Sequence, residues 1–134
     1  MEEARSLIDA LAGNNGRITV NWSLGVAVLP KGAIKLLLNL SHIAIDALVR
    51  GGTLDIGAES REGASEIVVR AAGPKIAFDQ TIGRALDGSL PQAELSSRTA
   101  PAWMLHLLAQ RQGGGLQYAL TPEALVMGAV LPEG

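Results

Sequence analysis

The feature that most constrains how this chain folds is an apolar helix that ends at a double glycine. Residues 31–50 carry leucine, isoleucine or alanine at almost every turn, and Gly51-Gly52 follows directly. Positions spaced i, i+4, i+7 and i+11 share one face of an α-helix. Here those positions form a thin polar line: Lys35, Asn39, His42 and Asp46. Such a helix either packs on a sheet with a wetted strip exposed, or it lines a pocket.

The rest of the chain alternates between helical and extended patterns, separated by glycine, proline and polar turns. We expect helices and strands over these ranges: helices 2–12, 31–50, 77–87 and 100–112; strands 17–22, 53–58, 66–72, 116–120 and 124–131. A polar link at 59–65 makes the second and third strands an antiparallel hairpin, and Thr99 is the expected N-cap of the last helix. This order predicts an α+β two-layer sandwich, with the helices on one face of a mixed, largely antiparallel sheet.

Composition excludes several classes of function. The chain has 134 residues, of which 48% are hydrophobic but only 3% aromatic, so its core must consist mainly of aliphatic side chains. The net charge is −2 and the basic residues are scattered, which argues against a nucleic-acid partner. No cysteine is present, and the histidines and carboxylates have no metal-ligand spacing. We therefore expect no metal, no membrane span and a cytoplasmic location.

Residues 36–44 resemble the N-box of the ATP-binding domain of sensor histidine kinases. That box is an Asn-Leu-Leu-x-Asn-Ala pattern within the first long helix, and three positions match it here: Asn39, Leu40 and Ala44. The second asparagine of the box, which holds magnesium in the family, corresponds to Ile43. An isoleucine has no oxygen to offer a cation that requires oxygen ligands.

The other nucleotide-binding boxes of that family are degenerate in this sequence. The Asp-x-Gly-x-Gly loop corresponds to residues 70–76, where Gly73 remains but alanine stands in place of the adenine-reading aspartate. The phosphate-cradling Gly-x-Gly loop should lie near 97–102, which contains no glycine. Residues 112–118 do resemble the glycines and strand that follow the last helix of the family. The resemblance therefore implies a retained shape without nucleotide-contacting residues, and no cofactor.

One group matches this combination closely, the bacterial histidine phosphotransferases of the ChpT type, which look like histidine kinases with a degenerate ATP-binding half. The resemblance covers almost the whole chain and is strongest at 33–40 and 46–54. In that family a helical hairpin precedes this domain, forms a dimeric four-helix bundle and carries the phosphoacceptor histidine. The resemblance implies that residues 1–12 are the tail of the hairpin, that 13–134 are the degenerate ATPase-like domain, and that the chain is a fragment.

The implied function is a part in a two-component phosphorelay, with receiver domains of response regulators as partners and homodimerisation through the missing bundle. No catalytic residue and no ATPase or kinase activity is expected within this chain. Its role would be regulator docking, near the 2–12 helix and around 73–99, with Arg84 and Arg98 as contact candidates. Six residues are candidates for lining a relic of the nucleotide pocket: Lys35, Asn39, His42, Asp46, Gly73 and Lys75.

Two alternatives remain open from the sequence. One is a live ATPase with unorthodox ligands, since Gly73-Pro74-Lys75 could approach a phosphate. The other is an unrelated α+β ligand-binding module. We favour a structural role for His42, half-buried and hydrogen-bonded to Asp46, and likewise for His106. For the polar line we favour a solvated surface over an anion site.

Overall fold

The computed structural model describes residues 2–15, 17–25, 31–61, 63–97, 99–111 and 113–132. Its elements are, in chain order, α1 (Glu2–Asn15), β1 (Ile18–Leu24), α2 (Lys31–Ala47), β2 (Gly52–Arg61), β3 (Ala64–Ala72), α3 (Gln80–Asp87), a 3₁₀ turn (Gln92–Glu94), α4 (Ala100–Arg111), β4 (Gly115–Leu120) and β5 (Ala124–Pro132).

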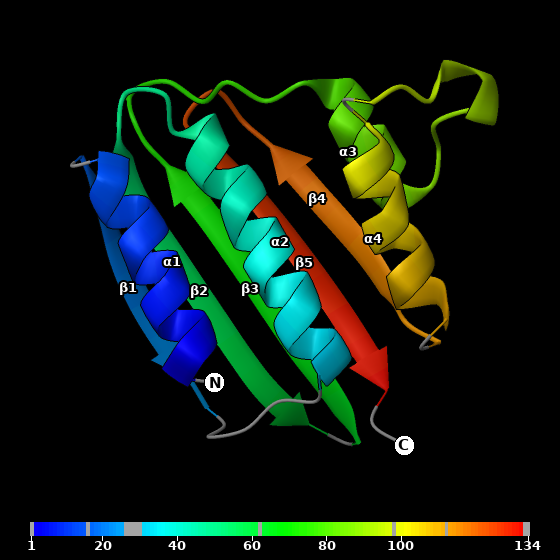
Figure 1. The fold of residues 1–134 in the computed structure, drawn as a ribbon, viewed down its shortest axis with the longest axis horizontal. Coiled ribbons are helices and arrows are strands. Elements are labelled where there is room, and N and C mark those ends of the chain that lie inside the picture. Colours follow the sequence, from blue (N-terminus) through cyan, green and yellow to red (C-terminus); the bar gives the residue numbers. More distant parts are fainter. Residues whose placement is uncertain are drawn as a thin grey trace.

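The five strands form one sheet in the order β1-β2-β3-β5-β4, and the helices cover one of its faces (Figure 1). β1 and β2 run parallel, while every other neighbouring pair is antiparallel. The parallel pair requires the crossover that α2 supplies. The predicted α+β sandwich with a mixed, largely antiparallel sheet is therefore confirmed.

The core lies between α2 and the middle of the sheet. Leu36, Leu37 and Leu40 of α2 are at most 1% exposed. Alternate residues of the central strands face them because successive side chains of a strand point to opposite faces: Leu54, Ile56, Ile67, Val69, Leu125 and Met127. Burying a side chain of this size contributes roughly 1.5–3 kcal/mol. This is why α2 tolerates so few polar residues.

The antiparallel hairpin predicted for the second and third strands is confirmed, but its link is shorter than the expected 59–65, since β2 runs to Arg61 and β3 begins at Ala64. Gly63, which directly precedes β3, has φ +79°. Polar side chains are compatible with strand here because one face of the sheet is not covered by helices (Figure 1). The first helix also runs further than predicted, through Gly13 to Asn15.

The end of α2 and the start of α3 both differ from the sequence prediction. The helix ends at Ala47 rather than at residue 50, because the Leu48 N–H bonds to the Ile45 carbonyl in a tighter turn at 3.1 Å. α3 begins at Gln80 rather than at 77, because Asp79 caps it by accepting a hydrogen bond from the Thr81 N–H at 2.8 Å. Both boundaries depend on hydrogen bonds that hydrophobic periodicity does not encode.

An indole bridge attaches α1 to the edge of the sheet. The Trp22 Nε1–H of β1 donates to the Asp9 carboxylate of α1 at 3.0 Å, and the Arg5 guanidinium lies 5.3 Å from the centre of the same ring. Ile8 and Ala12, also on α1, are buried in the core. These contacts fix α1 to the body of the domain.

Ser41 of α2 is fully buried, and its hydroxyl has no hydrogen-bond partner among the described residues. A buried polar group without a partner costs about 1–3 kcal/mol, and alanine is the better helix former. We therefore expect Ser41→Ala to raise the free energy of unfolding by about 1 kcal/mol, measured by urea denaturation. Ser41→Val, which enlarges the side chain at the same position, is the control and should not give this gain. A loss of stability in Ser41→Ala would show that the hydroxyl is satisfied in solution.

Candidate functional site

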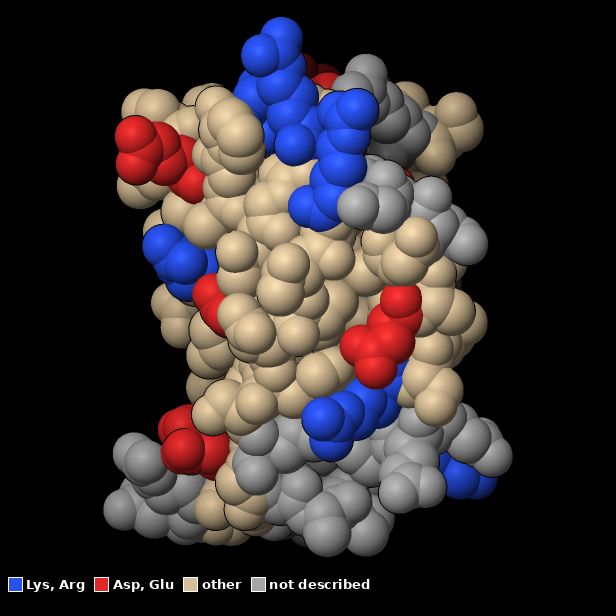
Figure 2. Space-filling model, turned by 90° about the vertical axis from the view of Figure 1, so that its left-hand side faces the viewer, with Lys and Arg blue, Asp and Glu red and all other residues tan. Residues whose placement is uncertain are grey.

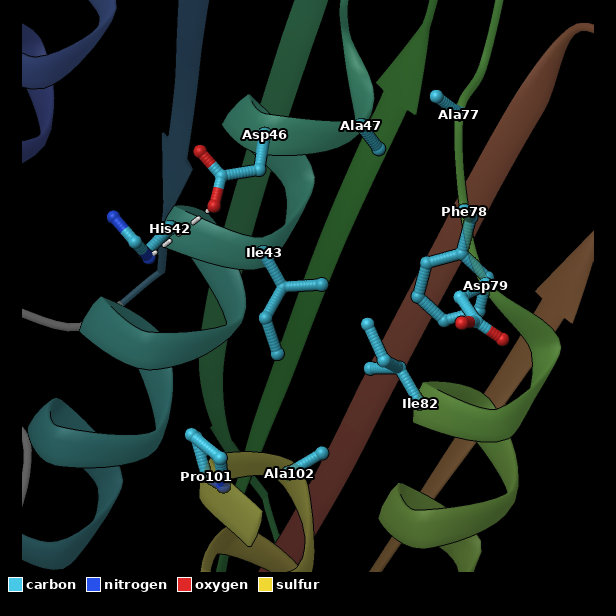
Figure 3. A pocket seen from close by; sticks show the side chains of 10 residues that line it. All are labelled: His42, Ile43, Asp46, Ala47, Ala77, Phe78, Asp79, Ile82, Pro101 and Ala102. Carbon is cyan, nitrogen blue, oxygen red and sulfur yellow. Dashed lines mark ion pairs between the residues drawn. The ribbon is translucent and has the colours of Figure 1, made fainter. Parts of the chain in front are cut away.

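A hollow of about 460 Å³ opens between α2, the segment that leads into α3, and the start of α4 (Figure 3). Side chains from all three elements point into it: Ile43 from α2, Phe78 and Ile82 from the segment and α3, and Ala102 from α4. The Phe78 ring is held by Tyr118 of β4, at a centroid distance of 5.7 Å. The interior of the hollow is therefore alkyl and aromatic.

The polar groups of this hollow sit at its rim. His42 Nδ1 lies 3.7 Å from Asp46 Oδ2, and the two side chains are 59% and 71% exposed. The expectation of a half-buried His42 is therefore wrong, because both side chains are largely exposed at the edge of the hollow. Asp79, the third polar residue of the lining, is engaged in capping α3. Among the described residues that line the hollow, the others are alkyl, aromatic or proline side chains.

The arrangement offers little to a magnesium–phosphate group. Ile43 places an alkyl side chain in the hollow where the kinase motif has an oxygen donor. Within the described ranges, no group of three or more acidic or histidine side chains lies close enough to hold a metal ion. α4 begins at Ala100 with Pro101 in its first turn, and proline has no N–H to donate.

A second, smaller hollow of about 240 Å³ lies between the first half of α2 and the side of α4 that leads to its end. Lys35 and Asn39 of α2 line it, together with Met104 and Arg111 of α4. The Asn39 amide donates to the Lys35 carbonyl at 2.7 Å, so part of its hydrogen-bonding capacity is used within the helix. The predicted polar line is thus divided between two hollows, which share Pro101 as a lining residue.

Gly73 and Lys75 line neither of these hollows. The Gly73 N–H bonds to the Glu123 carbonyl at 3.2 Å, and a Cβ at this position would overlap the carbonyl oxygen of Gly51. The glycine that survives from the degenerate loop is therefore required by a close backbone approach. Lys75 is exposed.

The remaining candidates lie around α3 and α4. Arg84 of α3 is half-buried, and its guanidinium lies 3.8 Å from the Glu94 carboxylate. Arg98 lies outside the described residues. The His106 ring packs over Gly88 and lies 5.1 Å from the Trp103 ring, which agrees with the structural role that we favoured for it.

Met104, which was not among the candidate site residues singled out from the sequence, projects from α4 with 62% exposure. Trp103, Met104, Leu107 and Leu108 are the apolar residues whose spacing predicts the helix over 100–112. These four positions fall within about 140° of one side of a helix, the width of an ordinary core-facing stripe, so the periodicity did not distinguish the exposed Met104 from its neighbours.

Comparison with known proteins gives a consistent result. The family model described as the histidine phosphotransferase C-terminal domain matches residues 1–124. Protein phosphotransferase ChpT of Brucella abortus (strain 2308) is 25% identical over 115 residues, which is 86% of this chain and 55% of that protein. The chain thus spans little more than half the length of this curated relative.

Solved structures agree with these sequence matches. The structure of a bacterial phosphotransferase superposes with a TM-score of 0.71 at 25% identity, over 87% of this chain and 57% of that one. The catalytic domain of histidine kinase ThkA superposes with a TM-score of 0.73 at 15% identity, over 98% and 90%. The second likeness shows the fold. Within the described residues, no helix combines the length and the apolar character that crossing a bilayer requires.

Proposed function

Because this chain belongs to the family of histidine phosphotransferase C-terminal domains, we propose that it is the non-ATP-binding part of a phosphotransferase that relays phosphoryl groups between response regulators. The acceptor histidine would lie in a helical hairpin preceding the domain. Its imidazole attacks the phosphorus of a phospho-aspartate and releases the carboxylate. The aspartate of a second regulator then attacks the phosphohistidine and releases the imidazole. No nucleotide enters this exchange, which would take place in the cytoplasm.

The observation that carries this proposal is the alkyl lining of the hollow at the N-box position. Ile43, Ile82 and Ala102 occupy the space into which a kinase would have to project oxygen ligands. Mg²⁺ requires near-octahedral oxygen coordination. The retained kinase-like fold would then serve to hold a docking surface rather than a nucleotide.

Two surfaces are our candidates for that docking. The α1 side of the domain presents a broad area of uncharged residues with basic and acidic groups around it (Figure 2), and Leu7 of α1 is 50% exposed there. We propose that the helical bundle, through which the protein would dimerise, continues from this side. Arg84 and Arg98 would contact the receiver domain, whose phosphorylation site carries acidic residues.

The test is phosphotransfer by the intact phosphotransferase from a phosphorylated regulator, with and without Mg-ATP. We expect transfer without nucleotide, and no saturable heat of Mg-ATP binding by calorimetry at micromolar concentrations. Reversing both charges, Arg84→Glu with Arg98→Glu, should lower kcat/KM for transfer about tenfold, since loss of rim charges mainly slows encounter. The effect should shrink at high salt.

Arg70→Glu is the matched control, because Arg70 lies on the uncovered face of the sheet, paired with Asp55 at 3.5 Å. It should leave the transfer rate unchanged. A requirement for ATP, or saturation by Mg-ATP at micromolar concentration, would instead establish the live ATPase. Equal rates for the wild type and the double variant would remove the two arginines from the docking surface.

A further inference from the structure

The two hollows along α2 adjoin at Pro101, and we refer to them together as the groove between α2 and α4. The larger hollow lies at the end of α2 and the start of α4, and the smaller one at the start of α2 and the end of α4. The two helices are thus antiparallel neighbours, and Pro101 lines both hollows. Lys35 and Asp46 at the two ends are separated by eleven residues of α2, about 16 Å at 1.5 Å per residue.

The walls of the groove are apolar along its length. Ile43 and Ile82 face each other in the larger hollow (Figure 3), and Leu105 and Leu108 line the smaller one. Met104 is the most exposed large hydrophobic residue of the described chain and lies on the rim of the smaller hollow. Flexible methionine side chains are common at surfaces that accept apolar partners.

The two ends of the groove carry opposite charges. Lys35 and Arg111 line the end at the start of α2, where both are exposed. Asp46 lines the other end, beside His42 and together with the capping residue Asp79. A ligand that fills the groove must therefore present negative charge at one end and positive charge at the other, with an apolar stretch between them.

We propose that this groove binds an amphipathic helix of a partner protein, lying parallel to α2, with acidic residues in its first turn and basic residues in its last. Acidic first turns and basic last turns are what the helix macrodipole favours. The backbone groups of α2 and α4 are bonded within their own helices, so the groove offers no strand edge to pair with, only side chains. An apolar helix face that contacts through i, i+3, i+4 and i+7 suits such a surface.

A small ligand fits the observations less well than a helix. The charged ends are about 16 Å apart, which is about three helical turns. Binding of the helix requires neither ATP nor a phosphorylated histidine, and so does not depend on the relay proposed above.

The test uses a stapled helical peptide of about 14 residues, titrated into the domain and followed by fluorescence anisotropy. It carries leucines at i, i+4, i+7 and i+11, two glutamates in its first turn and two lysines in its last. Its twin has the two charged turns exchanged. We expect the first peptide to bind about tenfold more tightly than the twin. Lys35→Glu with Arg111→Glu should reverse that preference, and Met104→Glu should weaken binding of the first peptide by at least tenfold.

Val68→Glu is the matched control, since Val68 is an exposed hydrophobic residue, 47% exposed, on the uncovered face of the sheet. It should leave the affinity unchanged, and thermal unfolding confirms that each variant is folded. The proposal is overturned if the first peptide fails to saturate below about 1 mM, if both peptides bind equally well, or if Met104→Glu and Val68→Glu behave alike. A dimer in sedimentation equilibrium that Met104→Glu dissociates would also overturn it, by assigning the groove to a second copy of the chain.

Discussion

Replacing Gly52 by alanine is expected to lower the free energy of unfolding by about 4 kcal/mol, a large fraction of the about 5–15 kcal/mol that stabilises a typical domain. Gly52 has φ +139°, a backbone conformation that residues with a Cβ rarely adopt, and forcing one into it costs roughly 1–3 kcal/mol. A Cβ would also overlap the carbonyl oxygen of Ala72 on the neighbouring strand. Backbone cannot move aside as a flexible side chain can, so the strain and the overlap add.

The position of Gly52 in the fold explains why it has no alternative conformation. It is the first residue of β2, and its N–H donates to the Arg17 carbonyl at 3.0 Å. Its neighbour Thr53 already pairs with Ala72 of β3. The chain therefore passes from the end of α2 into its place between β1 and β3 within a few residues. A side chain at Gly52 would separate β2 from β3.

Urea unfolding followed by tryptophan fluorescence measures the loss, since Trp22 and Trp103 lie on different elements. Gly115→Ala is the matched control: Gly115 begins β4, and a Cβ there meets nothing within 4 Å. We expect the control to change stability by less than about 0.5 kcal/mol. A Gly52→Ala domain as stable as the Gly115→Ala domain would contradict the argument.

The second large effect is expected at Gly83, in the middle of α3. A Cβ there would lie 2.6 Å from Cε2 of the Tyr118 ring, and the residue is buried. Alanine favours helix over glycine by about 1 kcal/mol, but forcing an extra atom into a packed contact costs more, typically 1–3 kcal/mol plus any shift of the backbone. We expect Gly83→Ala to lower the free energy of unfolding by about 2 kcal/mol.

A double-mutant cycle separates the steric contact with Tyr118 from the higher helix propensity of alanine. In a Tyr118→Leu background the ring is absent, so Gly83→Ala should be neutral or stabilising, giving a coupling of about 2 kcal/mol. Gly13→Ala is the control, because Gly13 lies in α1 with nothing within 4 Å of its Cβ position. It should gain about 0.5–1 kcal/mol. If Gly83→Ala also gained stability, α3 would not pack on Tyr118 as described.

The order and type of the elements could be predicted because they depend on local patterns. The apolar periodicity around Leu36 and Leu40 requires a helix buried on one side, and the alternation in β3 requires a strand. Element ends were less predictable. The end of α2 at Ala47 and the start of α3 at Gln80 are set by individual hydrogen bonds. Hydrophobic periodicity does not predict such bonds.

Of the candidate site, the side-chain chemistry was predictable and its grouping was not. The sequence alone showed that Ile43 cannot hold magnesium and that no glycine loop begins the last helix, because identity at a position is enough for that conclusion. It also placed Lys35, Asn39, His42 and Asp46 on one face of one helix. It gave no reason to pair them with Met104 or Arg111, or to give Gly73 a packing role.

The sequence by itself thus determined the order and type of the elements, the α+β class and the alkyl side chain at Ile43, because each follows from residue identity or from spacing within one segment. Only the tertiary structure decided the parallel pairing of β1 with β2, the exposure of His42 and the groove between α2 and α4. Each of these depends on how segments that are far apart in the chain are placed relative to one another. Such placements are set by how the intervening side chains pack, here Tyr118 under α3 and the leucines under α2.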